Sequence, residues 1–269
     1  MIRKLEVLML LLACTHYVCA QQDSIHIYQI QYKKTLNFND GSNPFISDEE
    51  YTKFIEFNRS LYDKINKSEN SETTIEDSED DALLSFMPSG KNISVVFKDY
   101  EERTLYSKHE VAYKYFVVED SLDIFNWQTM ETTKEILGFT CQMATMNFRG
   151  RDYIAWFTTA LPIGGPWKYD GLPGMILEIN SIDNFIAYEA TRLTNNVVNI
   201  GAIDNPFNLK KALTWDKFKT LYKKKAIELA SFKPNENTLG ITSSRGGIEM
   251  YIDENDMEYN AAIRKILNK

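Results

Sequence analysis

The fold of this chain is decided by the stretch Gly171-Leu172-Pro173-Gly174-Met175-Ile176, which joins a turn to an apolar strand. Proline fixes φ at about −65°, and glycine supplies the positive φ that the third position of a type II turn requires. The stretch therefore predicts a type II turn with Gly174 at that third position. The apolar run from Met175 to Ile179 predicts a short buried strand directly after the turn.

Similar short runs rich in β-forming residues lie on both sides of this strand, separated by turn residues. They span residues 25–32, 93–97, 113–118, 134–148, 152–159 and 185–189. Because the connections are short, neighbouring strands are expected to pair in antiparallel fashion. The sequence therefore predicts an α+β, mainly β protein whose curved antiparallel sheet is a meander or half-barrel, with a few packed helices.

Three segments predict helices. Ser47-Asp48-Glu49-Glu50 is typical of a capping box, and the apolar residues after it keep helical spacing to about Asn66. A second helix, packed on the sheet, is indicated by the spacing of Trp215, Phe218, Tyr222, Ala226 and Leu229. A short last helix is expected over residues 255–267.

The N-terminal residues 1–20 have the pattern of a signal peptide. Arg3 and Lys4 precede an apolar core, and Val18-Cys19-Ala20 resembles a signal-peptidase site. We expect export to the periplasm or the outer membrane, with one globular domain over residues 21–269. An alternative is a lipoprotein anchored through Cys14. No later segment approaches the roughly 20 apolar residues of a transmembrane helix.

Residues 68–81 contain seven acidic side chains and no basic one. Such a segment has too little apolar surface to offset the entropy lost on ordering, so we predict a flexible acidic insertion. A calcium site is the alternative, although the spacing of an EF-hand loop is absent. The formal net charge of the chain is −8. This charge repels nucleic acid and anionic lipid, and we expect neither as a general partner.

The sequence contains no familiar catalytic or metal-binding motif. Removal of the signal peptide leaves Cys141 as the only cysteine, so no internal disulfide is expected. Its neighbours form a strand-like run, which favours a buried thiol. His26 and His109 are the remaining histidines, too few with one cysteine for the usual transition-metal site. We predict no catalytic residues, no metal and no cofactor.

Three blocks, residues 134–144, 148–158 and 161–176, are similar to those of the GLPGLI family. The resemblance extends over about residues 133–190. Met175 stands where that family usually has leucine, a swap that conserves volume. The resemblance implies an exported protein of Bacteroidota without an established activity. A weaker similarity of pattern to exported lipid carriers of the lipoprotein-localisation type implies a sheet with a concave apolar face.

The connection from Ala160 to Gly174 is the strongest candidate site, because prolines and glycines alternate with aromatic residues along it. We expect Trp167 and Tyr169 to be displayed there and to wall a pocket together with Trp156 on the preceding strand. The alternative is that Trp167 folds back as a plug over the sheet edge. Arg149 and Arg151 flank a hairpin glycine, where they either hold a carboxylate or phosphate or are solvated turn residues.

Together these patterns favour an exported envelope protein that binds an apolar or peptidic ligand, or another envelope protein. The predicted ligand-binding residues are Trp156, Trp167, Tyr169, Arg149 and Arg151. A carboxylate-dependent hydrolase of peptides or glycans is one alternative, and for glycans it would need two facing carboxylates about 5 to 10 Å apart. A structural envelope component without a ligand is the other alternative.

Overall fold

A computed structural model describes residues 24–38, 41–65, 95–112, 114–231 and 245–268. The signal peptide predicted at residues 1–20, the lipidation alternative at Cys14 and the acidic insertion predicted at residues 68–81 lie outside these ranges. They stay predictions.

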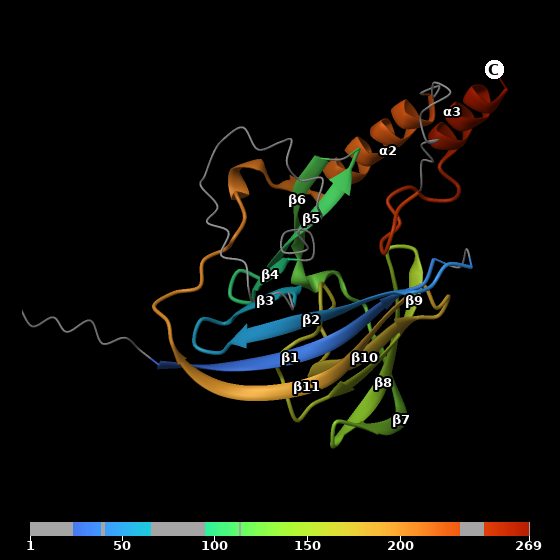
Figure 1. The fold of residues 1–269 in the computed structure, drawn as a ribbon. Coiled ribbons are helices and arrows are strands. Elements are labelled where there is room, and N and C mark those ends of the chain that lie inside the picture. The colour runs from blue at the N-terminus through green and yellow to red at the C-terminus, as the bar shows by residue number, and fades with distance from the viewer. Residues whose placement is uncertain (1–23, 39–40, 66–94, 113, 232–244, 269) are drawn as a thin grey trace, which may run out of the picture.

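The described residues form a mainly β fold with one open, curved sheet of 12 strands (Figure 1), which confirms the predicted fold class. Along the sheet the order is β12-β6-β5-β4-β3-β2-β1-β11-β10-β9-β8-β7. All pairings are antiparallel except the parallel pair of β12 and β6. The strands are β1 (Ser24–Leu36), β2 (Phe45–Phe54), β3 (Arg59–Lys64), β4 (Val96–Asp99), β5 (Thr104–Val111), β6 (Lys114–Ser121), β7 (Gln128–Ile136), β8 (Phe139–Phe148), β9 (Arg151–Thr158), β10 (Met175–Ser181), β11 (Ile186–Asn199) and β12 (Leu213–Thr214).

Two α-helices lie together at the β5–β6 end of the sheet (Figure 1). Helix α2 (Trp215–Ser231) packs Phe218 against Val111 and Val118, and helix α3 (Met257–Leu267) lies against α2. Both helices confirm the sequence prediction. Two short 3-10 helices, η1 (Leu122–Ile124) and η2 (Leu209–Lys211), complete the described elements.

The helix predicted from Ser47 to about Asn66 is wrong, because this segment contains strands β2 and β3. The buried residues of β2 alternate with more exposed neighbours, as in a strand packed on one face. Three of them are polar: Ser47, Glu49 and Lys53. Glu49 is satisfied by Lys34 at 3.1 Å and by the hydroxyl of Tyr62. Because several buried side chains of β2 are polar, its hydrophobic residues do not alternate along the sequence as they do in a typical strand.

The sheet curves far enough to bring distant strands together. Arg149, next to the β8–β9 turn, donates a hydrogen bond of 2.5 Å to Asp120 on β6. Strands β6 and β8 are separated by eight other strands in the sheet order. A direct contact between them therefore requires the sheet to wrap around the space that it encloses, and the buried core fills that space.

The type II turn predicted with Gly174 at its third position is also wrong. A positive φ is found at Gly171 (86°) but not at Gly174. Gly174 is required for a different reason, since a Cβ placed there would lie 2.1 Å from the carbonyl oxygen of Thr158. The strand predicted after it is confirmed as β10, which pairs with β9.

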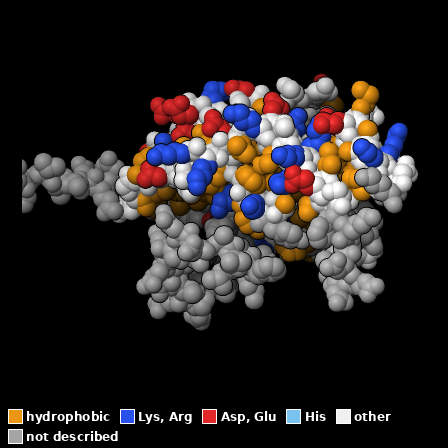
Figure 2. All heavy atoms as spheres, turned by 90° about the horizontal axis from the view of Figure 1, so that it is seen from above, with side chains coloured by type: hydrophobic (Ala, Val, Ile, Leu, Met, Phe, Trp, Pro, Cys, Tyr) orange, Lys and Arg blue, Asp and Glu red, His pale blue; other side chains and the backbone are white. Residues whose placement is uncertain are grey.

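The outer surface is mixed in character. Figure 2 shows acidic, basic and hydrophobic side chains interspersed over the face seen from above. None of the helices in the described ranges has the length and apolar character needed to cross a bilayer.

Candidate functional site

The connection between β9 and β10 crosses the enclosed face of the sheet instead of projecting from its edge. Its tyrosine, Tyr169, is fully buried, and Trp167 is 8% exposed. The ring of Tyr169 lies 5.2 Å from that of Tyr153 on β9 and 5.8 Å from that of Tyr188 on β11. Trp167 packs against the same tyrosine at 5.3 Å. The connection is therefore the centre of the aromatic core, and Trp167 and Tyr169 are buried there and not displayed as expected.

Lys98 on β4 anchors the middle of this connection. Its ammonium donates to the carbonyl oxygens of Gly165 (3.0 Å) and Tyr169 (2.8 Å) and to a carboxylate oxygen of Asp170 (2.9 Å). The hydroxyl of Tyr100 donates to the same oxygen of Asp170 at 2.8 Å. Lys98 is buried, and its three donors match three acceptors, which is the condition under which a buried charge is tolerated.

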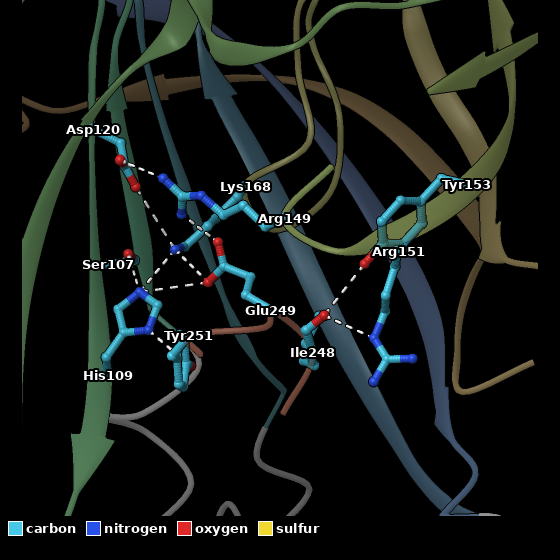
Figure 3. A network of polar contacts seen from close by, with 10 residues as sticks. All are labelled: Ser107, His109, Asp120, Arg149, Arg151, Tyr153, Lys168, Ile248, Glu249 and Tyr251. Carbon is cyan, nitrogen blue, oxygen red and sulfur yellow. Dashed lines mark hydrogen bonds and ion pairs between the residues drawn. The ribbon is translucent and has the colours of Figure 1, made fainter. Parts of the chain in front are cut away.

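Lys168, between the two buried aromatics, belongs to a second cluster that we call the buried charge network: His109, Asp120, Arg149, Lys168 and Glu249 (Figure 3). The side chain of Lys168 is completely buried. Its Nζ lies 2.8 Å from Oε2 of Glu249, 2.7 Å from Nε2 of His109 and 3.9 Å from Oδ2 of Asp120.

The network is balanced in charge. Arg149 bonds to Asp120 at 2.5 Å and also to Glu249. Lys168 bonds to Glu249 as well, so the two cations Arg149 and Lys168 face the two carboxylates of Asp120 and Glu249. His109 stays neutral, because burial and then the positive charges of Lys168 and Arg149 hold its pKa well below the usual 6.5. The balance explains how five polar side chains are accommodated in the interior.

One polar atom in this network is left without a hydrogen bond. Oδ2 of Asp120 is buried and has no hydrogen-bond partner among the described residues, whereas Oδ1 accepts from Arg149. Nζ of Lys168 lies 3.9 Å from Oδ2, beyond hydrogen-bond distance. An unsatisfied buried carboxylate oxygen is uncommon and calls for an explanation.

The two arginines predicted to hold a ligand carboxylate hold groups of the protein itself. Arg149 binds Asp120 and Glu249, and its guanidinium stacks 3.3 Å from the ring centroid of Trp215. Arg151 donates to the carbonyl oxygens of Ile248 (3.1 Å) and Gly247 (3.0 Å) and also pairs with Asp183. Both arginines therefore attach the segment around residue 249 to the sheet.

Trp156 lies apart from the other predicted site residues. Tyr153 and Phe157 on β9 are buried on the enclosed face, and Trp156 belongs to the alternate set of side chains on that strand. Its ring is covered by Lys134 at 4.4 Å, which in turn bonds to Glu178 at 2.7 Å. The structure does not bring Trp156 to the enclosed face that Tyr169 occupies. A role of these aromatics in ligand binding stays a prediction.

A pocket of about 570 Å³ opens beside the buried charge network. Five of its lining residues are acidic and one is basic, and we call it the acidic pocket. Its lining residues are Glu102, Arg103, Thr104, Glu119, Asp120, Ser121, Asp123, Thr214, Trp215 and Asp216. The single cation, Arg103, is already paired with Asp123. Arg149 lies behind the pocket, since it contacts both Asp120 and Trp215.

The sequence did not reveal that His109, Asp120, Lys168 and Glu249 contact one another in the buried charge network. The only local signal was Lys168, a cation between two aromatic residues in a connection rich in proline and glycine. Cys141 is free and buried, as predicted, and burial raises the pKa of its thiol to about 11. The described residues contain no group of three or more His, Cys, Asp or Glu side chains placed to hold a metal.

Residues 149–178 match the model of a family described as a protein of unknown function (Porph_ging). The matched segment contains Arg149, Arg151, the whole connection after β9 and the beginning of β10. No curated protein matches the chain.

The solved structures that resemble part of the chain include two of PNGF-II. The structure in space group P21 has a TM-score of 0.44 and 16% identity over 75% of this chain and 34% of that chain. The structure in space group C2 has a TM-score of 0.41 and 16% identity over 70% of this chain and 31% of that chain. This chain spans about a third of the length of PNGF-II.

Proposed function

We propose that this protein is an exported envelope protein of the GLPGLI family that binds a peptidic ligand through a cationic group. Export is supported by the signal-peptide pattern of residues 1–20, and the family by the blocks around Gly171–Ile176 together with the match to a family of unknown function over residues 149–178. The binding site that we propose is the acidic pocket.

The observation that carries the proposal is the imbalance of charge around that pocket. Five carboxylates and one arginine line it. Arg103 pairs with Asp123, Asp120 pairs with Arg149 behind the wall, and Asp216 lies 3.5 Å from Lys219. Glu102 and Glu119 add two further negative charges, so the lining keeps an excess of carboxylates whether or not Asp120 is charged. Low-dielectric walls concentrate the field of such a lining, so the pocket attracts a cation. Trp215 adds an aromatic surface, which is typical of sites that recognise an amine or guanidinium together with apolar groups.

The rear wall of the pocket is rigid. Asp120 and Trp215 are both fixed by Arg149, which is held in place by Glu249. Of the residues predicted from sequence, Arg149 therefore contributes to the site indirectly. Trp167 and Tyr169 support it from the core, because they flank Lys168 of the buried charge network.

The test is binding of short peptides that carry lysine or arginine, compared with acidic peptides of equal length, by native mass spectrometry and calorimetry. We expect binding of the basic peptides that weakens as salt is added, since exposed charges are screened. The double variant Glu102→Gln/Asp216→Asn should weaken binding about tenfold or more, because two exposed charges of the pocket are removed.

A matched control removes the same charge elsewhere. Glu131 on the edge strand β7 and Glu258 in the first turn of α3 are exposed and lie outside the acidic pocket. Glu131→Gln/Glu258→Gln should leave peptide binding unchanged. Equal loss in both double variants would show that only the net charge matters and would reject the pocket. Cleavage of the peptide during the experiment would favour the carboxylate-dependent hydrolase instead.

A further inference from the structure

The buried charge network contains a lysine, an aspartate and a glutamate in an arrangement that can react with itself. We propose that Lys168 and Asp120 form an intramolecular isopeptide bond, with Glu249 as the proton-transfer group. The bond would join the connection after β9 to strand β6 across the enclosed face of the sheet.

Lys168 and Asp120 lie close together in the interior. Nζ of Lys168 is 3.9 Å from Oδ2 of Asp120, and both side chains are at least nine-tenths buried. Cγ, the atom that Nζ would attack, is bonded to Oδ2, so the amine and the carboxyl group are neighbours in the interior. Reacting groups that are held close together gain a large effective concentration. Oδ2 is also the oxygen without a hydrogen bond in the part of the chain that the structure describes, so its departure would break none there.

The neighbours of Lys168 can remove a proton from its ammonium. Lys168 donates to Glu249 at 2.8 Å and lies 2.7 Å from His109, and both partners are groups that can accept a proton. In addition, burial lowers the pKa of the Lys168 ammonium. A neutral amine is the form of lysine that can act as a nucleophile.

The reaction balances without any other reactant. Glu249 takes one proton from the Lys168 ammonium and passes it to the carboxylate of Asp120. The lone pair of Nζ attacks Cγ of Asp120, the N–C bond forms and the bond from Cγ to Oδ2 breaks. Oδ2 leaves as water with that proton and a second proton from Nζ, and an amide N–H remains.

Formation of the bond would neutralise a buried pair of charges. The reaction removes one positive and one negative charge from the interior, and Arg149 and Glu249 remain as a complete ion pair. Oδ1 of Asp120 becomes the amide oxygen and can still accept from Arg149, while the amide N–H can donate to Glu249. Since desolvation penalises buried charges, the interior favours the neutral amide over the ion pair.

The buried pair of Lys98 and Asp170 provides an internal control. These side chains are closer, at 2.9 Å, but the other two acceptors of Lys98 are main-chain carbonyl oxygens, which do not take up protons. The carboxylate oxygen of Asp170 also accepts from Tyr100. We expect this pair to stay ionic.

The experiment is mass spectrometry of the full chain after expression and purification. The denatured protein should be one water molecule lighter than its sequence requires, and the Lys168→Arg variant should have its full mass. Trypsin should release residues 99–103, because Lys98 remains a free lysine. It should not cut after an amidated Lys168, so residues 115–134 should be recovered linked to residues 152–192.

Further variants separate the isopeptide from other losses of water. Glu249→Gln should accumulate the unlinked chain, as should Asp120→Ala. A cyclic imide at Asp120-Ser121 would also remove water, but residues 115–134 would then be recovered alone. Recovery of unlinked 115–134 and 152–168 from the wild-type protein would overturn the proposal, whether or not any variant folds.

Discussion

Replacement of Lys98 by methionine tests whether the connection after β9 is held by a buried charge. The ammonium of Lys98 satisfies two main-chain carbonyls and one carboxylate in a site that is 1% exposed. Methionine fills a similar volume but leaves Asp170 with a buried charge whose described hydrogen bonds come from Tyr100 and the N–H of Gly171. Removal of one partner from a buried ion pair costs about 3 to 5 kcal/mol.

Two assays are used: equilibrium unfolding in urea, and native-state hydrogen exchange of the amides over residues 161–174. We expect the free energy of unfolding to fall by about 3 kcal/mol or more, and exchange in this segment to rise more than in β1 or β11. Lys134→Met is the matched control, since Lys134 pairs with Glu178 at a site where the two side chains are 35% and 28% exposed. That change should cost about 1 kcal/mol or less. Equal effects of the two variants would refute the role given to Lys98.

Three further outcomes follow from the same structure. Gly174→Ala should destabilise the protein by about 1 to 3 kcal/mol, because the new Cβ would meet the carbonyl of Thr158; Gly201→Ala, with open space around it, should be silent in the same urea titration. Trp167→Ala should cost about 3 to 5 kcal/mol in urea unfolding, and a loss below 1 kcal/mol would contradict its burial in the core. The lowered pKa of His109 means that the unfolded chain takes up a proton below pH 6.5 before the folded one does, so stability should decline as the pH falls through 6.5, and His109→Gln should flatten that decline.

The β-rich runs and the two C-terminal helices were predictable because local patterns determine them. Phe218 and Ala226 of α2 face the core at helical spacing, as their periodicity indicated. Strand β2 was not predictable in this way. Its buried face carries Ser47, Glu49 and Lys53. Hydrophobicity cannot reveal a face whose polar groups are satisfied within the fold, as Glu49 is by Lys34 on β1 and Lys53 by Asn58 in the β2–β3 turn.

The candidate site was even less predictable from local sequence patterns than strand β2. The aromatic connection was identified from its composition, but whether it faces solvent or the core depends on how far the sheet curves. The partners of Lys168 lie 59 and 81 residues away in the chain, at His109 and Glu249. No local pattern links them. They are brought together only when β5, the connection and the segment around residue 249 meet.

These separations have a consequence for how the chain acquires its structure. Glu249 supplies the carboxylate that neutralises both Lys168 and Arg149, across 81 and 100 residues. Until residue 249 has been synthesised, Lys168 and Arg149 have Asp120 but not Glu249 as a native partner. Contacts of such long range slow folding. We therefore expect the sheet to close around its core late in folding, when Glu249 reaches Lys168 and Arg149.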